Sequence, residues 1–309
     1  MKYKFLTGDE LKPYSTQLAR FEAQFRYPLG DGRHFRISHG EDYGAFFRSL
    51  GAPRYILVLD DGGEVAAFTA AVRRPVPKRH SPPQDMWYLC DFKIAKPHRG
   101  GRTFIGMGSR MLPRFYRFWI GAYFVAMNNR PLSELLGEAE LQVGGIATLI
   151  PMRRFPAFKP VSLQAIFFQP PLDGPVTGTD GSRETLGPEA WRLTIQEPEG
   201  TYVLTCLRGI KDLLIEPSLE PMRFLHVGAF QLAREGDPAA NLLALIRSAR
   251  LRAGAWGAET LCFCWDAHDR PMIAALAAAG LTTESSGTTY DLYPPGVKRL
   301  PLPIQTAEI

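Results

Sequence analysis

Residues 91–103 read Asp-Phe-Lys-Ile-Ala-Lys-Pro-His-Arg-Gly-Gly-Arg-Thr, and this segment constrains the fold more than any other. An apolar strand, expected at 86–95, breaks at Pro97, opens into a glycine-rich basic turn and leads into an expected helix. The N–H groups of such a turn, its arginines and the positive end of the helix would meet at one place. The pattern therefore predicts an α/β fold with an anion-binding turn between a strand and a helix.

The charge around this turn is one-sided. Residues 92–133 contain eight Lys or Arg and no Asp or Glu, which indicates an anionic partner, although a basic solvated surface is the alternative. The net charge of +5 is too small to indicate nucleic acid by itself. A basic, proline-rich excursion at 73–83, near Trp87 and Tyr88, leaves a nucleic-acid contact open, but a solvated loop is the favoured interpretation.

The four cysteines lack the spacing of a metal site or a redox motif; they are Cys90, Cys206, Cys262 and Cys264. We therefore expect no disulfide framework, no metal site and a reducing, cytoplasmic location. The N-terminus does not read as a signal peptide, and no apolar run approaches 18 residues, so no membrane association is expected.

At 309 residues the chain is long enough for two domains. The order of strands and helices is similar in its two halves, and a stretch rich in Pro, Gly, Asp and Thr separates them. We predict a first domain at 1–160, a linker at 161–190, a second domain at 191–297 and a tail at 298–309.

The expected elements follow from apolar periodicity and turn residues. In chain order they are a helix at 8–24, a strand at 34–38, a helix at 41–50, a hairpin at 55–72, strands at 86–95 and 122–127 with a helix at 104–120 between them, a strand at 140–152, strands at 202–207 and 222–230, a helix at 238–253, a strand at 260–265, a helix at 270–279 and a strand at 288–292.

The turn carries a resemblance to a known family. The GNAT superfamily of acyl-CoA N-acyltransferases has an apolar-x-apolar strand followed by x-Pro-x-x-Arg-Gly-x-Gly and a helix. Here the matching places hold Phe92, Ile94, Pro97, Arg99, Gly100 and Gly101. The resemblance covers residues 34–150 and implies two GNAT-like domains, each a mixed, mostly antiparallel sheet flanked by helices.

The resemblance also implies a cofactor site for acetyl-CoA or another acyl-CoA. The backbone amides of Phe92, Lys93 and Ile94 would bind the pantetheine arm. The turn that holds the pyrophosphate would consist of Arg99, Gly100, Gly101, Arg102 and Thr103. An Asn side chain that reaches the arm would be Asn128 or Asn129, directly after the next strand.

The chain departs from the family pattern at several positions. Arg102 and Phe104 stand where the family has two small residues. Leu135 and Leu136 lie seven residues after the two asparagines, where the family often has a Tyr that serves as general acid.

The second half resembles the same fold without its anion site. Asp269, Met272, Leu276 and Gly280 copy the spacing of a family helix, but the turn at 233–238 carries two acids that would repel a pyrophosphate. We interpret this half as a non-binding copy that shapes the acceptor site or the domain interface.

Acyl transfer to an amine needs a base and an acid near the thioester. Asp91 on the cofactor strand is the candidate base, and the alternative is a structural carboxylate that faces a neighbouring strand and binds the backbone or an Arg. Tyr123 is a candidate acid, as is Tyr88, although a strand Tyr is more often a core aromatic.

The favoured function is an N-acyltransferase that moves an acyl group, acetyl first among them, from acyl-CoA to the amine of a small molecule or a protein by direct attack. A degenerate GNAT-like protein that binds CoA without turnover is the alternative. A nucleic-acid-associated protein is the third and weakest hypothesis.

Overall fold

The computed structural model describes residues 1–30, 33–78, 81–99, 101–116, 121–127, 159–176, 180–283, 285–292 and 306. Gly100, Asn128, Asn129 and the strand expected at 140–152 lie outside these residues. The described helices are α1 Ser15–Glu22, α2 Ala45–Leu50, α3 Gly101–Tyr116, α6 Pro238–Ala255 and α7 Arg270–Ala278, with 3-10 turns η1 Gly8–Tyr14 and η2 Lys96–His98. Among the described helices, none combines the length and the hydropathy needed to cross a bilayer.

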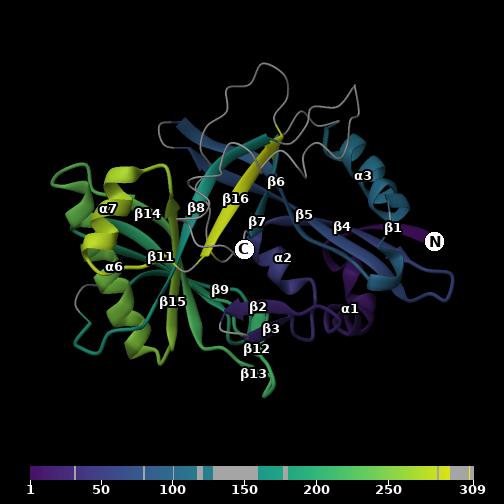
Figure 1. Ribbon diagram of the computed structural model, residues 1–309, viewed down its shortest axis with the longest axis horizontal. Helices are drawn as coiled ribbons and strands as arrows, with labels where there is room; N and C mark the ends of the chain where they lie inside the picture. Colours follow the sequence, from purple (N-terminus) through teal and green to yellow (C-terminus); the bar gives the residue numbers. More distant parts are fainter. Residues whose placement is uncertain are drawn as a thin grey trace.

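Twelve strands form one large sheet (Figure 1). In spatial order they are β1 Lys2–Thr7, β4 Ala52–Leu59, β5 Val65–Lys78, β6 Ser81–Ile94, β7 Gly121–Met127, β16 Ser285–Leu292, β8 Lys159–Gln169, β15 Thr260–Asp266, β14 Phe224–Leu232, β11 Gly200–Cys206, β10 Trp191–Glu197 and β9 Asp180–Thr185. Among the described ladders of this sheet, only β6 with β7 and β14 with β15 are parallel. The predicted mixed, mostly antiparallel sheet flanked by helices is confirmed, and both halves of the chain contribute to one continuous sheet.

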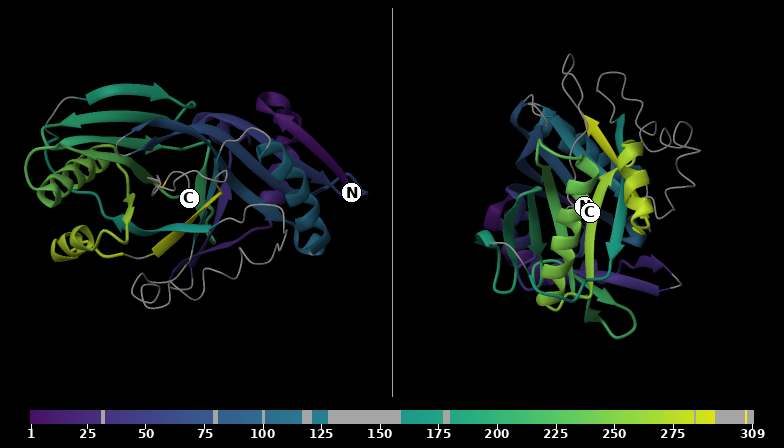
Figure 2. Two further views of the ribbon diagram at one scale, coloured as in Figure 1. Left: turned by 90° about the horizontal axis from the view of Figure 1, so that it is seen from above. Right: turned by 90° about the vertical axis from the view of Figure 1, so that its left-hand side faces the viewer.

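Two regions, which we call the N-terminal region (residues 1–127) and the C-terminal region (residues 180–283), are joined at the centre of this sheet by strands that lie outside both. The last strand, β16, pairs with β7 on one side and with β8 on the other. Strand β8, from the middle of the chain, pairs in turn with β15. Each region is therefore completed by a strand that lies outside it in the sequence (Figures 1 and 2).

Three local predictions differ from the structure. The expected linker contains strands β8 and β9, because the apolar run around Ile166 and Phe167 is buried in the sheet. The expected basic loop at 73–83 instead extends strands β5 and β6, where Arg73 is 2.6 Å from Asp85. The expected helix at 8–24 divides into η1 and α1, and Pro13, which lacks an N–H donor, lies inside η1.

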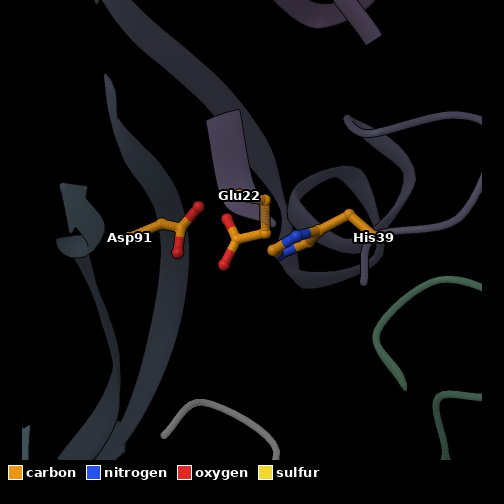
Figure 3. A group of neighbouring side chains, drawn as sticks. All are labelled: Glu22, His39 and Asp91. Carbon is orange, nitrogen blue, oxygen red and sulfur yellow. The ribbon is translucent and has the colours of Figure 1, made fainter. Parts of the chain in front are cut away.

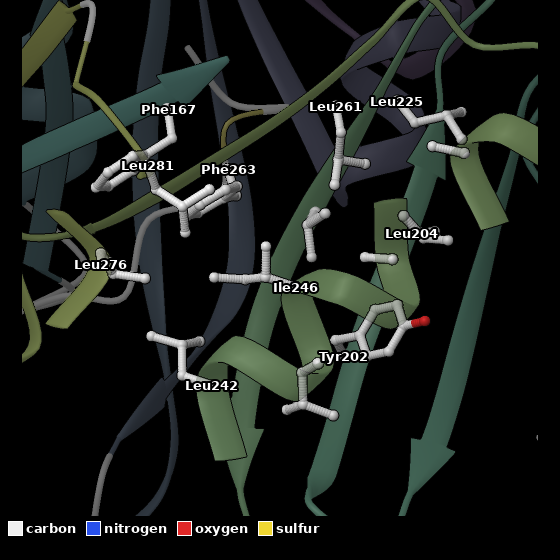
Figure 4. Close-up of a cluster of buried hydrophobic side chains, with 14 of the residues drawn as sticks. Phe167, Tyr202, Leu204, Leu225, Leu242, Ile246, Leu261, Phe263, Leu276 and Leu281 are labelled. Carbon is white, nitrogen blue, oxygen red and sulfur yellow. The ribbon is translucent and has the colours of Figure 1, made fainter. Parts of the chain in front are cut away.

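Two large apolar cores pack against the sheet, and the first also takes in Ala190, Leu207 and Ile210 of the C-terminal region. In the N-terminal region, α1 and α2 bury Phe21 and Phe47 against Tyr55 and Phe68 of the sheet. In the C-terminal region, α6 and α7 cover the strands, and Figure 4 shows Leu242 and Ile246 of α6 facing the sheet. The remaining labelled members of this second core are Phe167, Tyr202, Leu204, Leu225, Leu261, Phe263, Leu276 and Leu281.

A small second sheet also joins the two regions. Its order is β13 Glu220–Pro221, β12 Asp212–Ile215, β3 Arg33–Ser38 and β2 Tyr27–Gly30. Next to β12, the Glu216 carboxylate accepts hydrogen bonds from Arg26 Nε at 2.7 Å and Arg36 Nε at 2.6 Å. The two regions therefore pair directly in the small sheet, whereas β16 and β8 lie between them in the large sheet.

Candidate functional site

Strands β6 and β7 part in the middle of the large sheet. They pair in parallel from Met86 to Tyr88, and the ladder stops there although β6 continues to Ile94. On its other edge, strand β7 pairs with β16 from Ala122 to Met127. Within the described residues, β6 from Asp91 to Ile94 has no strand partner on the side that faces β7. Unpaired backbone groups at such an edge can bind an extended ligand that carries its own amides.

A β-bulge lies on the unpaired stretch of β6. Phe68 pairs with Lys93 and Ala70 with Cys90, so that Asp91 and Phe92 both lie opposite Thr69. Asp91 has φ of 55°, in the left-handed region that residues other than glycine rarely adopt. Bulges re-aim side chains and are common beside active sites. Here the bulge turns the Asp91 carboxylate towards α1 and α2, while 44 % of Phe92 stays exposed.

A basic turn follows at the end of β6. The N–H groups of His98 and Arg99 donate to the carbonyls of Ala95 and Lys96 at 2.8 and 3.3 Å, which closes η2. Arg99 Nε donates to the carbonyl of Ile94 at 3.1 Å, so that its guanidinium is held beside the parted strand. Helix α3 begins at Gly101 with no acid in its first turn. The positive end of this helix and the Arg99 guanidinium therefore both favour an anionic ligand.

A buried group of charges lies behind the bulge, on the side of α1 and α2. Lys93 Nζ is 2.6 and 2.7 Å from the two carboxylate oxygens of Glu22, and it also contacts Asp91 Oδ1. The Tyr43 hydroxyl lies 2.6 Å from Glu22 Oε2 and 3.0 Å from Asp91 Oδ2. Only 2 % of the Glu22 side chain and 8 % of the Lys93 side chain are exposed.

The two carboxyls of this group differ in acidity. Burial, followed by the charge of Asp91, raises the pKa of Glu22 to about 7. Burial also opposes ionisation of Asp91, but the Lys93 ammonium, His39 and the hydrogen bonds from Lys93 and Tyr43 together outweigh burial, and the pKa of Asp91 is lowered. Burial lowers the pKa of His39 to about 3, so this imidazole stays neutral.

Glu22, His39 and Asp91 converge closely enough to resemble a metal site (Figure 3). One ligand atom from each lies within 4.8 Å of the others. The cation between the two carboxylates is, however, the ammonium of Lys93. Because a metal ion would have to displace a buried and doubly paired lysine, we interpret the group as a charge cluster.

The described residues of the predicted cofactor site lie on β6, in the turn after it and at the start of α3, but their surroundings differ. Phe92, Ile94 and Arg99 border the parting, and the ring of Phe92 is 5.5 Å from that of Phe104. Lys93 can offer only its backbone there, since its side chain is in the charge cluster. Arg102 is exposed, whereas Thr103 is only 3 % exposed.

Tyr123 lies at the last paired position of β7 with β6. It is 1 % exposed, and its ring stacks on Tyr88 at 5.2 Å. Tyr123 is therefore surrounded as a core aromatic side chain would be, at the position where β6 and β7 begin to separate. Its role as an acid stays a prediction.

The sequence interpretation missed Glu22 and Tyr43. A signal for Glu22 exists, because Leu18, Phe21 and Glu22 lie on one face of α1, and all three are buried. A carboxylate on the apolar face of a helix needs a buried partner. The partner itself, Lys93, is 71 residues away in the chain and could not be assigned from the sequence.

Comparison with protein-family models and with the sequences of curated proteins gives no match. Comparison with solved structures gives clear similarities. Saccharomyces cerevisiae N-myristoyltransferase with bound myristoyl-CoA matches with a TM-score of 0.61 at 10% identity, over 95% of this chain and 79% of that one. A tandem GNAT protein from the clavulanic acid biosynthesis pathway matches with a TM-score of 0.54 at 10% identity, over 96% of this chain and 100% of that one.

These identities are low, and the likeness concerns the fold. The matches cover 95% and 96% of this chain, so the likeness extends over both regions. The chain has the fold of the GNAT superfamily of acyl-CoA N-acyltransferases.

Proposed function

We propose that the protein is an N-acyltransferase that moves an acyl group from acyl-CoA to an amine by direct attack. The observation that carries this proposal is the parting of β6 and β7 at Tyr88, with a bulge at Asp91 and a basic turn at the end of the same strand. An acyl-CoA has an amide-bearing arm and a pyrophosphate, and these two features match the unpaired edge and the turn.

The arm would lie along the edge at Phe92, Lys93 and Ile94, and Arg99 and the start of α3 would hold the pyrophosphate. Gly100, Asn128 and Asn129 complete the proposed site from positions outside the described residues. The two matched proteins support an acyl-CoA donor, since one was solved with myristoyl-CoA and the other is a GNAT protein.

For the transferred group we propose acetyl first, with longer chains as the competing choice. Phe92 and Phe104, 44 % and 37 % exposed, offer an apolar surface beside the parting that a longer chain could use. The acceptor would be a small molecule or a protein with a free amine, bound between the N-terminal and C-terminal regions. We propose the cytoplasm as the location, because all four cysteines are free thiols.

Calorimetry with acetyl-CoA and with acyl-CoAs of increasing length tests donor binding, and release of free thiol with a panel of amines tests turnover. Arg99→Glu should weaken binding, whereas Arg234→Glu, in the corresponding turn of the C-terminal region, is the matched control and should leave it unchanged. No heat with any acyl-CoA at high micromolar concentration would reject the proposal.

One observation favours a second candidate, a CoA-binding protein without turnover. Asp91, the base predicted from the sequence, is paired with Lys93, and its lowered pKa makes it a weak base. This candidate predicts acyl-CoA binding with no thiol release for any amine, and the same two measurements distinguish it from the enzyme.

A further inference from the structure

The charge cluster has a feature that ion pairing alone does not require: one phenol bridges two carboxyls of different acidity. The Tyr43 hydroxyl is within hydrogen-bond distance of both Glu22 Oε2 and Asp91 Oδ2. It has a single proton, so it donates to one carboxylate and can accept from the other if that one is protonated. This is the geometry in which a proton can pass from one carboxyl to the other through the phenol.

Asp91 is the member of the cluster nearest to the proposed chemistry. Its backbone forms the bulge on the unpaired edge of β6, and 11% of its side chain is exposed, against 2% for Glu22. The left-handed φ of 55° is an unfavourable conformation that the surrounding structure must maintain. The bulge turns this carboxylate towards Tyr43 and Glu22, while the backbone of Asp91 stays on the parted strand.

We propose that Asp91, Tyr43 and Glu22 form a proton relay that accepts the proton of the attacking amine and stores it on Glu22. This inference rests on the proposed function, because it needs an amine and a thioester at the parting. Lys93 is a positioning residue in it, since its ammonium holds both carboxylates in place.

The step balances in atoms and charge. The amine nitrogen forms a C–N bond with the thioester carbonyl, and the C–S bond breaks. The nitrogen gives one proton to Asp91, Asp91 passes a proton to the oxygen of Tyr43, and Tyr43 passes its own to Glu22. CoA leaves as a thiolate and takes a proton from water, and Glu22 later returns its proton to water.

The acidities agree with this direction. The pKa of Asp91 is lowered and that of Glu22 is raised to about 7, so the proton resides on Glu22. Near neutral pH Glu22 can therefore both accept and release a proton, as catalysis requires. The groups that face Glu22 from the elements packed around it are Asp91 and Lys93 of β6, Tyr43 and His39 before α2, Tyr27 of β2 and Lys211 before β12.

Burial lowers the pKa of Lys211 to about 8 and keeps His39 neutral. With Lys93 and Lys211 charged, two cations oppose two carboxylates near pH 7. The neutral His39 adds no charge to this balance, and Glu22 is the group in it that titrates near neutral pH.

The test compares three variants by the pH dependence of thiol release. In the wild type, turnover should rise with pH with an apparent pKa near 7. Glu22→Gln should remove this limb and lower kcat by about 100-fold, and Tyr43→Phe by about 10- to 100-fold, in the range of general base catalysis. Tyr55→Phe is the matched control: Tyr55 lies in the same core, and its buried hydroxyl has no hydrogen-bond partner among the described residues.

Acyl-CoA binding, measured by calorimetry, should be the same in all four proteins. Absence of binding in the wild type would reject the proposed function, whereas intact binding with an unchanged pH profile in Glu22→Gln would reject the relay. A further readout needs no turnover: by NMR of labelled glutamate, the Glu22 carboxyl should titrate near pH 7 in the ligand-free protein and shift in Tyr43→Phe. Titration near the ordinary 4.5 would also overturn the relay.

Discussion

The N-terminal and C-terminal regions each contain a bulged strand that parts from a parallel neighbour. In the N-terminal region, β6 leaves β7 after Tyr88. In the C-terminal region, β14 pairs with β15 only from Phe224 to His226, and Ala229 and Phe230 lie opposite Tyr202 in a bulge like that of β6. The same backbone arrangement therefore occurs twice, and the side chains around it must decide what each copy can bind.

Those side chains differ most at the turn after the strand. In the N-terminal region the turn is basic, and α3 begins with no acid in its first turn. In the C-terminal region the Asp237 carboxylate accepts the N–H of Ala239 at 3.1 Å and caps α6, and Asn241 Nδ2 donates to the carbonyl of Glu235 at 2.9 Å. An anion would meet a carboxylate already bound to this helix N-terminus.

The surroundings of the bulge also differ. Behind β6 lies the buried cluster of Glu22, Lys93 and Asp91. Beside β14, Phe230 contacts the rings of Phe263 and Trp265 with centroids 6.0 and 6.2 Å apart. The same strand arrangement is therefore packed against charged side chains in one copy and against aromatic side chains in the other.

The strongest test of the comparison is to remove the strand that the two regions share. Deleting residues 285–309 removes β16, which pairs with β7 and β8 at once. We expect loss of cooperative folding, because both central edges would be exposed to water. Circular dichroism and urea unfolding measure this, and the point variant Thr306→Val is the control that keeps β16.

Two separate fragments sharpen the same point. Residues 1–176 and 180–309, produced alone, should not fold, but together they should associate, because each supplies a strand to the other. Independent cooperative folding of either fragment would contradict the exchange of β8 and β16.

The second prediction tests whether the turn at Arg99 and the turn at Arg234 differ in ligand binding. Arg99→Glu should weaken acetyl-CoA binding by about 10- to 100-fold, since it reverses a charge at the proposed pyrophosphate site. Arg234→Glu should have no effect, because its turn already carries acids. Calorimetry at constant salt measures the acetyl-CoA affinity of both variants. An equal loss of affinity in the two would contradict the claim that only the turn after β6 binds the ligand.

The third prediction concerns pH and the charge cluster. The folded-state pKa of Glu22 is raised from 4.5 to about 7, so its contribution to stability is complete below pH 4.5 and is lost as pH rises through 7. Relative to Glu22→Gln, the wild type should lose at most about 1.4 kcal/mol of unfolding free energy per pH unit in this window. Urea unfolding at several pH values measures it, and a difference that does not change with pH would contradict the raised pKa.

The smallest expected effect belongs to the cap of α6. Asp237→Ala should lower the unfolding free energy by about 1 kcal/mol, as loss of an N-cap usually does. Arg234→Ala, in the same turn, should be nearly neutral. Equal urea midpoints for Asp237→Ala and the wild type would show that the cap is not a stabilising contact.

Much of the fold was predictable because its signals are local. The hairpin of β4 and β5, strand β6 and its basic turn, and helices α6 and α7 follow from periodicity and turn residues near each other in the chain. The exchange of β8 and β16 was not predictable, since a buried apolar strand carries no information about which of two regions it completes.

The residues of the candidate site also divide into those with a local signal in the sequence and those without one. Arg99 and the strand at Asp91 belong to a continuous motif and were found from it. Glu22 and Tyr43 come from other segments, and only the folded chain brings them to Lys93. For Lys93 the motif assigned only the backbone, and the burial of its side chain between two carboxylates is seen only in the folded chain.

Hydrogen exchange of backbone amides, with and without acetyl-CoA, tests the central claim most directly. The account predicts that acetyl-CoA slows exchange along β6 from Leu89 to Ile94 and in the turn that follows, and leaves β14 from Val227 to Leu232 unchanged. No protection of β6, or equal protection of β14, would contradict the claim that the parted strands of the N-terminal region form the acyl-CoA site.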